Sequence, residues 1–365
     1  CWGDVPFKTT STEDAYNLSI PRTDKQTIYD FIIKEMYGSA EDLKSAQDLN
    51  YLPGRVSKSA AWGMLARVYM FRAGEPKRDK EVGLANNTTS AEITEYFKKA
   101  SYYAQLVKNE GHSLTAKYWD FFIDICSDKY NTALNKDGAK ANESIWEVEF
   151  AGNRSTDVRA EGRIGNIIGI QGKDLSSKAS ITGKTEPGST YGDRESKNDA
   201  NKNRNRAAAK YRREYEADKK SKNDTSINFP LLRYSDILLM IAEAENEVNH
   251  GPNDLAYECI NTVRERAGIK KLAANLDEES FRKAIKDERA MELCFEYTRR
   301  FDLIRWGDYY KLMQEQVDKA QADESWKFGI NVYTYFNIPK SYNYFPIPAN
   351  EIGSNGAIKT NNPGW

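Results

Sequence analysis

The chain has 365 residues, of which 39% are hydrophobic and 12% aromatic, and its formal net charge is −1. This length and apolar content are enough for one large or two ordinary globular domains, while the near-neutral charge excludes a broad basic surface for nucleic acid and an acidic tail. No run of about eighteen apolar residues occurs, so the sequence predicts no membrane-spanning helix.

The amino terminus reads Cys1-Trp2-Gly3-Asp4, with no initiator methionine, basic n-region or apolar h-region. This indicates a fragment or a processed chain. A lipid-bearing Cys1 is the alternative, but apolar residues follow it without a flexible polar tether. We therefore expect any lipid anchor to lie outside this sequence.

Apolar residues at helical spacing predict a first helix over 27–37. A second helix is expected to begin at Ser57, which is a good N-cap residue, and to extend to about Phe71. Gly74 and Pro76 are expected to stop it.

A third helix is predicted over 93–107, after an insertion rich in Asn and Thr. The spacing Trp-x2-Leu-Ala-x2-Tyr over 62–69 matches the first half of a tetratricopeptide helix, in which a large residue packs over small ones. The region 57–110 is therefore interpreted as one tetratricopeptide-like helix pair.

A second such pair is predicted over 232–268, with one helix over 234–248 and another over about 253–266 that Gly268 closes. The two pairs are too far apart for a regular solenoid, whose repeats follow at a fixed period. We expect a mainly α fold in which helix pairs carry large insertions.

Between the two pairs the character of the sequence changes. Residues 144–150 alternate apolar and polar like a short half-buried strand, and Trp146 is expected to pack in the core. The segment of about 150–225 is rich in Gly, Ser, Asn, Lys and Arg. Because a loop this long in a compact protein is usually functional or disordered, we expect the specificity to reside there.

Several familiar site patterns are excluded. The stretch 178–185 lacks the leading glycine of a phosphate-binding loop, 199–210 lacks the glycine and final glutamate of a calcium loop, and no dinucleotide fingerprint or nucleophile elbow occurs. The four cysteines are too widely spaced for a CxxC-type metal site and too few for a disulfide framework. His112 and His250 both adjoin glycine at predicted helix ends, the usual capping context.

Within 281–310, Glu288, Arg289 and Glu292 continue the helical stripe that begins with Phe281. Charges at core-like positions must be paired. The expected partners are charged residues further along the chain, which are Arg299, Arg300, Asp302 and Arg305. We interpret this set as a structural ion-pair network that fixes how one helix meets the next. An anion site formed by the arginines is the alternative.

The carboxy-terminal quarter carries a recognisable signature, DERAMELCFEYTRRFDLIRWG over 287–307. It resembles that of the SusD/RagB nutrient-binding lipoproteins of Bacteroidetes. Further matches occur in the family's order, and they are GDVP at 3–6, PRT at 21–23, LRYSDILLMIAEA at 232–244, INTVRERAG at 260–268, PIPANEI at 346–352 and NPGW at 362–365. The likeness covers nearly the whole chain.

The resemblance implies a SusD-like fold of tetratricopeptide-like helix pairs with long irregular insertions and short strands, as a single domain over 1–365. The family's amino-terminal part is expected to be missing, which makes Cys1 an internal residue, and 281–365 is the family's carboxy-terminal region. The resemblance further implies a protein that is lipid-anchored to the outer membrane at the cell surface and has no catalytic activity, cofactor or metal. Its expected partners are an oligosaccharide or polysaccharide and a SusC-like TonB-dependent transporter.

Sugar capture requires aromatic faces for the apolar side of sugar rings and planar polar groups for the hydroxyls. The candidates share this chemistry and a position after the predicted strand, and they are Asn153, Arg154, Arg159, Arg163, Tyr191, Arg194, Tyr211 and Tyr215. For the last two, the alternative is a solvated face of a helix over 207–217. The Lys/Arg excess over 194–222 could favour an acidic glycan, although a solvated loop is the commoner meaning.

Three other functions stay open. The chain could bind a non-glycan nutrient, or only brace the transporter. A glycoside hydrolase needs just two correctly spaced carboxylates, but with 54 acidic residues the sequence does not single out a pair.

Overall fold

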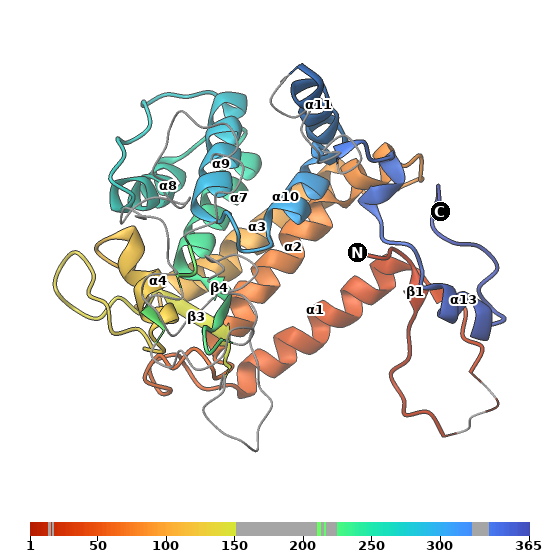
Figure 1. Cartoon of the computed structure of the whole chain (residues 1–365), viewed down its shortest axis with the longest axis horizontal. Coiled ribbons are helices and arrows are strands. Elements are labelled where there is room, and N and C mark those ends of the chain that lie inside the picture. The colour runs from red at the N-terminus through yellow and green to blue at the C-terminus, as the bar shows by residue number, and fades with distance from the viewer. Residues whose placement is uncertain (14–15, 17, 151–209, 213–214, 217–224, 323–335) are drawn as a thin grey trace, which may run out of the picture. The chain divides into compact units, whose positions relative to one another are not determined.

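Helices form most of the described part of the chain, and its strands are short (Figure 1). The structure is a computed structural model that describes residues 1–13, 16, 18–150, 210–212, 215–216, 225–322 and 336–365. In chain order the elements are β1 (Val5–Pro6), β2 (Arg22–Thr23), α1 (Lys25–Asp42), α2 (Lys58–Glu81), α3 (Ser90–Lys108), α4 (Tyr118–Cys126), β3 (Ser144–Val148), β4 (Phe229–Arg233), α7 (Tyr234–Asn249), α8 (Asp254–Arg266), α9 (Glu278–Glu292), α10 (Arg299–Trp306), α11 (Tyr309–Ala322), the 3-10 helix η4 (Lys340–Asn343) and α13 (Ala349–Ser354). The prediction of a mainly α fold is confirmed.

The chain divides into two compact units, each formed by segments that are distant in sequence. The first unit comprises Cys1–Gly38, Val68–Tyr96 and Arg300–Trp365. The second unit comprises Ser39–Arg67 and Phe97–Arg299.

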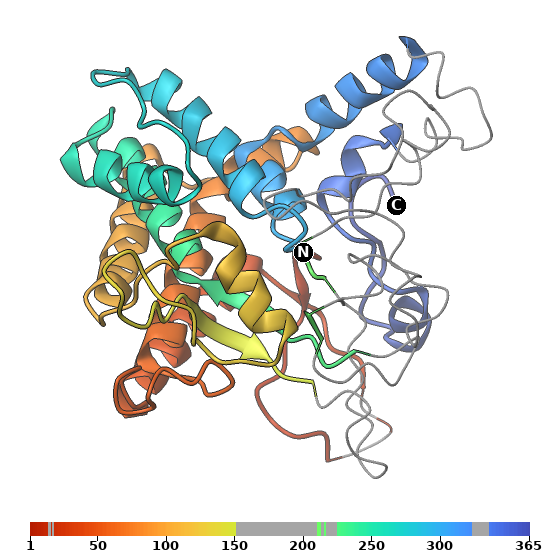
Figure 2. The same ribbon diagram turned by 60° about the vertical axis from the view of Figure 1, so that its left-hand side comes forward.

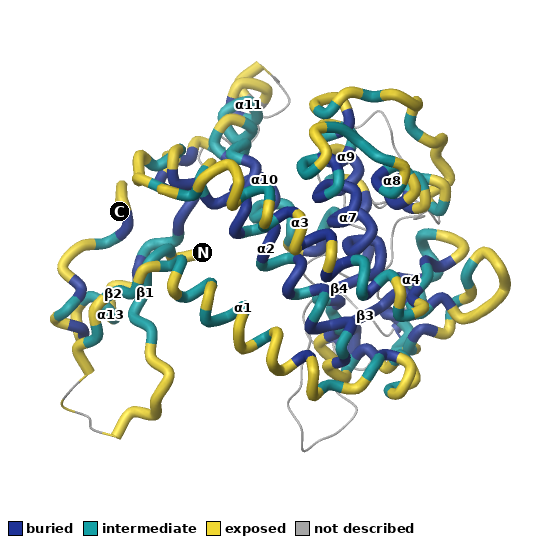
Figure 3. The backbone as a smooth tube through the Cα atoms, turned by 180° about the vertical axis from the view of Figure 1, so that it is seen from behind, coloured by how far each residue is buried: buried dark blue, intermediate teal, exposed yellow. Residues whose placement is uncertain are grey.

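Helix α7 is central to the second unit, and α8 and α9 pack against it. Figure 3 shows that α7 is buried over most of its length. Asn253 caps α8 by accepting a hydrogen bond of 2.9 Å from the backbone N–H of Ala256, and Asp277 caps α9 through the N–H of Ser280 at 2.7 Å. Helices α7 and α8 both lie within the range 232–268 and pack against each other.

The first unit has its own apolar cluster, formed mainly by α10 and the residues around it. Its buried members are Leu303, Ile304, Trp306, Tyr309 and Ile338. A separate two-stranded antiparallel ladder joins β1 and β2, with Val5 opposite Thr23. Near the carboxy terminus, the rings of Tyr342 and Trp365 stack with their centroids 4.8 Å apart.

Helix α2 continues beyond Gly74 and Pro76, so the prediction that these residues end it is wrong. Gly74 serves close packing instead, because a Cβ at this position would lie 2.4 Å from the backbone oxygen of Arg305 in α10. Beyond the proline, Asp79 is fully buried and pairs with Lys25 at 2.7 Å. Tertiary contacts therefore hold the last turns of α2 against their weak local propensity.

Strands β3 and β4 pair antiparallel, and the predicted strand is confirmed over 144–148. Its buried face differs from the expected one. The register shifts on both sides of Trp146, which marks a β-bulge. As a result Glu147 is only 5% exposed, whereas Val148 is 39% exposed and Trp146 is partly buried.

Candidate functional site

The β3–β4 ladder holds the two ends of the irregular segment next to each other (Figures 1 and 2). Val148, the last residue of β3, lies opposite Phe229, the first residue of β4. Beyond the ladder, the side-chain carbonyl of Asn228 accepts a hydrogen bond of 3.0 Å from the backbone N–H of Phe150. The two ends of the irregular segment are therefore held side by side.

Of the predicted sugar-contacting residues, only Tyr211 and Tyr215 are described. The others, Asn153, Arg154, Arg159, Arg163, Tyr191 and Arg194, lie outside the described residues, as do the loop patterns over 178–185 and most of 199–210. The Tyr211 side chain is 0% exposed, and its ring lies edge-on to that of Phe122 with the centroids 5.7 Å apart. Tyr215 packs against the same apolar cluster and is partly buried.

The sequence suggests either a sugar contact or a solvated helix face for Tyr211, and neither interpretation predicts this burial. A buried ring offers no face to a sugar in this conformation, and it also does not belong to a solvated helix face over 207–217. The ring packs in a buried apolar cluster with Phe121, Ile125 and Ile227. Burial of an aromatic side chain stabilises a fold by several kcal/mol in general. Tyr211 thereby attaches the returning end of the irregular segment to α4.

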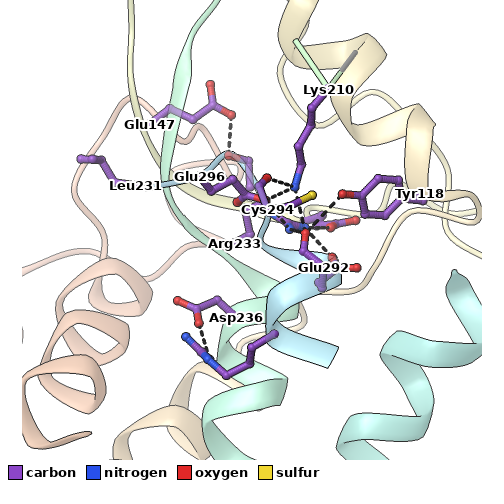
Figure 4. Close-up of polar contacts among 12 residues, drawn as sticks. Tyr118, Glu147, Lys210, Leu231, Arg233, Asp236, Glu292, Cys294 and Glu296 are labelled. Carbon is purple, nitrogen blue, oxygen red and sulfur yellow. Dashed lines mark hydrogen bonds and ion pairs between the residues drawn. The ribbon is translucent and has the colours of Figure 1, made fainter. Parts of the chain in front are cut away.

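Arg233, the last residue of β4, is the centre of a buried ionic cluster (Figure 4). Its guanidinium contacts three carboxylates. Nε and Nη2 each donate to a carboxylate oxygen of Glu296 at 2.8 Å, and Nη1 donates to Glu143 at 2.8 Å and to Glu292 at 2.9 Å. Arg266 joins the same carboxylates, with Nη1 2.9 Å from Glu143 and Nη2 bonded to Glu292. The cluster unites β4, α8 and the end of α9.

Lys210 attaches the irregular segment to this cluster. Its side chain is 0% exposed, and Nζ donates to the backbone oxygens of Glu292 and Cys294 at 2.9 and 2.8 Å and to Glu296 at 2.5 Å. Nζ also lies 4.7 Å from the centre of the Phe122 ring, a cation–π distance. Figure 4 shows Lys210 and Arg233 converging on Glu296 from different elements.

Opposite charges within the cluster favour the ionised forms of Glu143 and Arg233 despite their burial. Burial alone would raise the pKa of Glu143, but the neighbouring Arg266 and Arg233 lower it below its usual value. Burial acts to lower the pKa of Arg233, and the carboxylates of Glu296 and Glu292 raise it well above the usual range. Buried charges of this kind stay ionised because each has opposite charges and hydrogen bonds around it.

Helix α9 carries the charged residues predicted at core positions, and they are buried, but the ion pairs seen here use partners that precede α9 in the sequence. Glu288 pairs with Arg264 at 2.7 Å, and Arg289 pairs with Asp236 at 2.8 Å. Asp236 also pairs with Arg67 at 2.6 Å. Burial would raise the pKa of Asp236, yet these two arginines hold it well below its usual range.

The partners expected from the sequence make other contacts as well. Arg299 donates to the backbone oxygen of Lys286 at 3.2 Å, and Arg300 donates to that of Tyr342 at 2.9 Å. Asp302 and Arg305 pair with each other within α10 at 2.8 Å. Each of these contacts is structural.

Glu147 lies in β3, just before the irregular segment, and accepts hydrogen bonds from two neutral groups, the hydroxyl of Ser144 and, at 3.1 Å, the amide of Asn228. Burial raises the pKa of Glu147 to about 7, and the nearby carboxylates of Glu149 and Asp124 act in the same direction. This carboxyl group is therefore poised to ionise near neutral pH at the base of the segment.

The two histidines are structural. His112 is buried, with Nδ1 2.8 Å from the backbone oxygen of Asn142 and Nε2 2.9 Å from the hydroxyl of Ser59. Burial lowers its pKa, so the ring is neutral near pH 7. His250 is the C-cap of α7, in the left-handed conformation with φ 53°. Its position at a helix end is the one expected from the sequence.

The described residues contain no group of three or more His, Cys, Asp or Glu placed to hold a metal ion. No helix among them has the length and apolar character needed to cross a membrane. The buried ionic cluster is closed to ligands because its charges are already satisfied by one another. Its contribution is to fix the base from which the irregular segment extends.

Sequence reasoning did not identify Glu143, Lys210, Arg233, Arg266 or Glu296 as members of one cluster. Arg233 and Arg266 both lie in motifs that carry the family resemblance, and this was the only indication in the sequence that they are important. Their partners could not be assigned, since Glu143 and Arg233 are 90 residues apart in sequence.

Comparisons with known proteins agree on one family. The sequence model of the SusD family matches residues 125–365. The chain is similar to SusD-like protein P2 of Formosa agariphila, with 24% identity over 401 residues, which cover 100% of this chain and 70% of that protein.

Two solved structures show the same fold. One is a SusD homolog from Bacteroides thetaiotaomicron VPI-5482, with a TM-score of 0.75 and 24% identity over 94% of this chain and 71% of that one. The other is surface glycan-binding protein A from Bacteroides uniformis, with a TM-score of 0.60 and 20% identity over 99% of this chain and 73% of that one.

Proposed function

Because the chain belongs to the SusD family, we propose that it binds an oligosaccharide or polysaccharide at the cell surface and delivers it to a SusC-like TonB-dependent outer-membrane transporter. The family match carries this proposal, and the similarity in fold to a surface glycan-binding protein supports it. Membership of the SusD family makes the chain a binding protein and not an enzyme. A lipid anchor would hold it at the outer membrane.

We place the main glycan contacts in the irregular segment, at the residues suggested by its chemistry. These are Asn153, Arg154, Arg159, Arg163, Tyr191 and Arg194. The support is the base of the segment: the β3–β4 ladder joins its two ends, and Lys210 and Tyr211 attach its returning end to buried parts of the second unit. Binding residues commonly lie on loops that a rigid scaffold positions.

Affinity gel electrophoresis tests the binding. The protein is expected to be retarded by at least one polysaccharide of a panel containing amylopectin, laminarin, xyloglucan and polygalacturonate. Tyr191→Ala and Asn153→Ala are expected to restore migration. Tyr102→Ala serves as the control, since this tyrosine is 55% exposed on α3, outside the irregular segment.

Normal migration in every gel would contradict glycan binding, and release of reducing sugar from any polysaccharide would contradict a non-catalytic role. Delivery is tested separately by co-purification from outer membranes solubilised in detergent. A transporter of the TonB-dependent kind is expected to elute with the protein. Elution of the protein alone would remove this part of the proposal.

A further inference from the structure

The first unit contains a polar cavity of about 380 Å³, which is lined in part by the ion pair of Lys25 and Asp79. Its walls come from Asp4, the start of α1, the second half of α2, the loop 84–88 and the start of α3, all within the first unit. The volume lies in the range of small-molecule sites in general. The loop is part of the Asn/Thr-rich insertion noted in the sequence.

A buried carboxylate makes the floor of this cavity rigid. Asp79 is 0% exposed and accepts hydrogen bonds from Lys25 Nζ at 2.7 and 2.8 Å, from the amide of Asn86 at 2.6 Å and from the hydroxyl of Tyr344. The positive charge of Lys25 is therefore balanced by the carboxylate of Asp79. The hydrogen bond from Asn86 fixes the loop 84–88 to α2. A cavity that is formed before the ligand arrives loses less free energy to ordering when it binds.

Three carboxylates that line the cavity each use only one oxygen in hydrogen bonds with the protein, so the other oxygen can accept from a ligand. Asp24 uses Oδ1 to cap α1, Glu92 uses Oε2 to accept from Thr89 at 2.7 and 2.8 Å, and Asp4 uses Oδ1 to accept from the backbone N–H of Lys25 at 3.1 Å. The second oxygen of each makes no hydrogen bond with a described residue. The bonds from Thr89 lower the pKa of Glu92, so this acceptor stays ionised.

Neutral hydrogen-bonding groups complete the lining. The side-chain amide of Asn87 is exposed, and neither it nor the hydroxyl of Tyr96 forms a hydrogen bond within the described parts of the chain. Desolvation raises the pKa of Tyr96, so its hydroxyl keeps its proton. The ring of Tyr96 is held by the guanidinium of Arg72, 4.6 Å from its centre, and Arg72 in turn pairs with Asp30 at 2.7 Å.

We propose that this cavity binds one neutral or amino sugar unit and forms a second carbohydrate site, separate from the irregular segment. Free carboxylate oxygens accept from sugar hydroxyls or an ammonium group, and the amide and phenol supply donors. An acidic sugar is rejected because the carboxylates outnumber the cations, and Lys25 and Arg72 are already paired with Asp79 and Asp30. A bound metal ion is a poor alternative, since no group of ligating residues that could hold one occurs in the described chain.

This inference rests on the proposed function, because it assumes that the protein meets glycans. Isothermal titration calorimetry with maltohexaose, laminarihexaose, chitosan hexamer and an oligogalacturonide tests it. Tyr96→Phe removes only the hydroxyl and keeps the ring that Arg72 covers, and Asn87→Ala removes only the exposed amide. Each is expected to weaken binding of a neutral or amino probe about fivefold, the value of one ordinary hydrogen bond. Tyr37→Phe is the matched control, since Tyr37 is 53% exposed on α1 outside the cavity.

Charge selectivity is tested with Asp24→Asn, because asparagine caps a helix as well as aspartate does. This variant is expected to bind the chitosan probe about threefold more weakly and to improve the relative binding of the oligogalacturonide. Hydrogen exchange with a bound neutral or amino probe should show protection of the amides over 84–92.

Glycan binding by the wild type with unchanged affinity in Tyr96→Phe and Asn87→Ala, and no protection over 84–92, would overturn the second site and leave the proposed function standing. Absence of binding to all probes and polysaccharides would remove both.

Discussion

Arg233 and Glu296 form a two-point ion pair, with Nε 2.8 Å from one carboxylate oxygen and Nη2 2.8 Å from the other, and both side chains are buried. Arg233 ends β4, and Glu296 follows α9 in the chain. The pair therefore links the base of the irregular segment to the end of α9. Such bidentate pairs fix orientation as well as distance.

Replacement of Arg233 by methionine should leave Glu143, Glu292 and Glu296 buried with fewer opposite charges. We expect Arg233→Met to lower the free energy of unfolding by about 3–5 kcal/mol, the usual loss when one partner of a buried pair is removed. Urea denaturation followed by circular dichroism measures it. The control is Lys283→Met, whose exposed pair with Asp287 should contribute less than about 1 kcal/mol. Equal losses in the two variants would contradict a structural role for the cluster.

Local patterns predicted the helices well because local rules govern them. Asn253 and Ser57 were recognisable as caps, and each accepts the expected hydrogen bond from the helix that it starts. The end of α2 was missed because it depends on tertiary contacts, of which the close approach at Gly74 is one. No periodicity in a single segment reports such a contact.

The candidate site depends on contacts between distant segments, which local patterns do not report. A charge at a core-like position reveals that a partner exists but not which one, and so Arg264 and Asp236 were not assigned to α9. After the β-bulge next to Trp146, Glu147 is buried and Val148 is exposed, although Ile145 before it is buried. The family motifs identified the architecture, whereas the proposed specificity residues lie mainly outside the described structure.

The hydroxyl of Tyr211 is buried and has no hydrogen-bond partner among the described residues. A buried unpaired hydroxyl is unfavourable, so Tyr211→Phe should raise the free energy of unfolding by about 1 kcal/mol. Urea denaturation measures this change. Because the ring packs against Phe122, glycan affinity should stay as in the wild type. Weaker glycan binding without a gain in stability would show that this tyrosine contacts the ligand after all.

Gly74 and Gly38 are both helical glycines but have opposite surroundings. A Cβ at Gly74 would collide with the backbone of Arg305, whereas nothing lies within 4 Å of one at Gly38. We expect Gly74→Ala to destabilise the chain by about 2–3 kcal/mol through overpacking. Gly38→Ala should stabilise it by about 0.5–1 kcal/mol, because alanine has less chain entropy to lose. Thermal unfolding measures both, and a shift of the same sign in the two variants would contradict the packing of α2 on α10.

Glu147 should make the stability of the fold depend on pH. The affected range lies between the pKa of an ordinary glutamate and the higher pKa of Glu147 in the folded chain. Its pKa in the folded chain is about 7 against a reference value of 4.5, so the folded state holds the proton more tightly than the unfolded state. This contribution is fully present below about pH 4.5 and is lost as the pH rises through 7, with a total of about 3 kcal/mol.

Glu147→Gln imitates the protonated form. Relative to the wild type it should have similar stability at pH 4.5 and higher stability at pH 8, as measured by urea denaturation at each pH. Glu41→Gln, on an exposed face of α1, controls for the change in net charge. A constant difference between Glu147→Gln and the wild type across this pH range would show that Glu147 does not titrate in it.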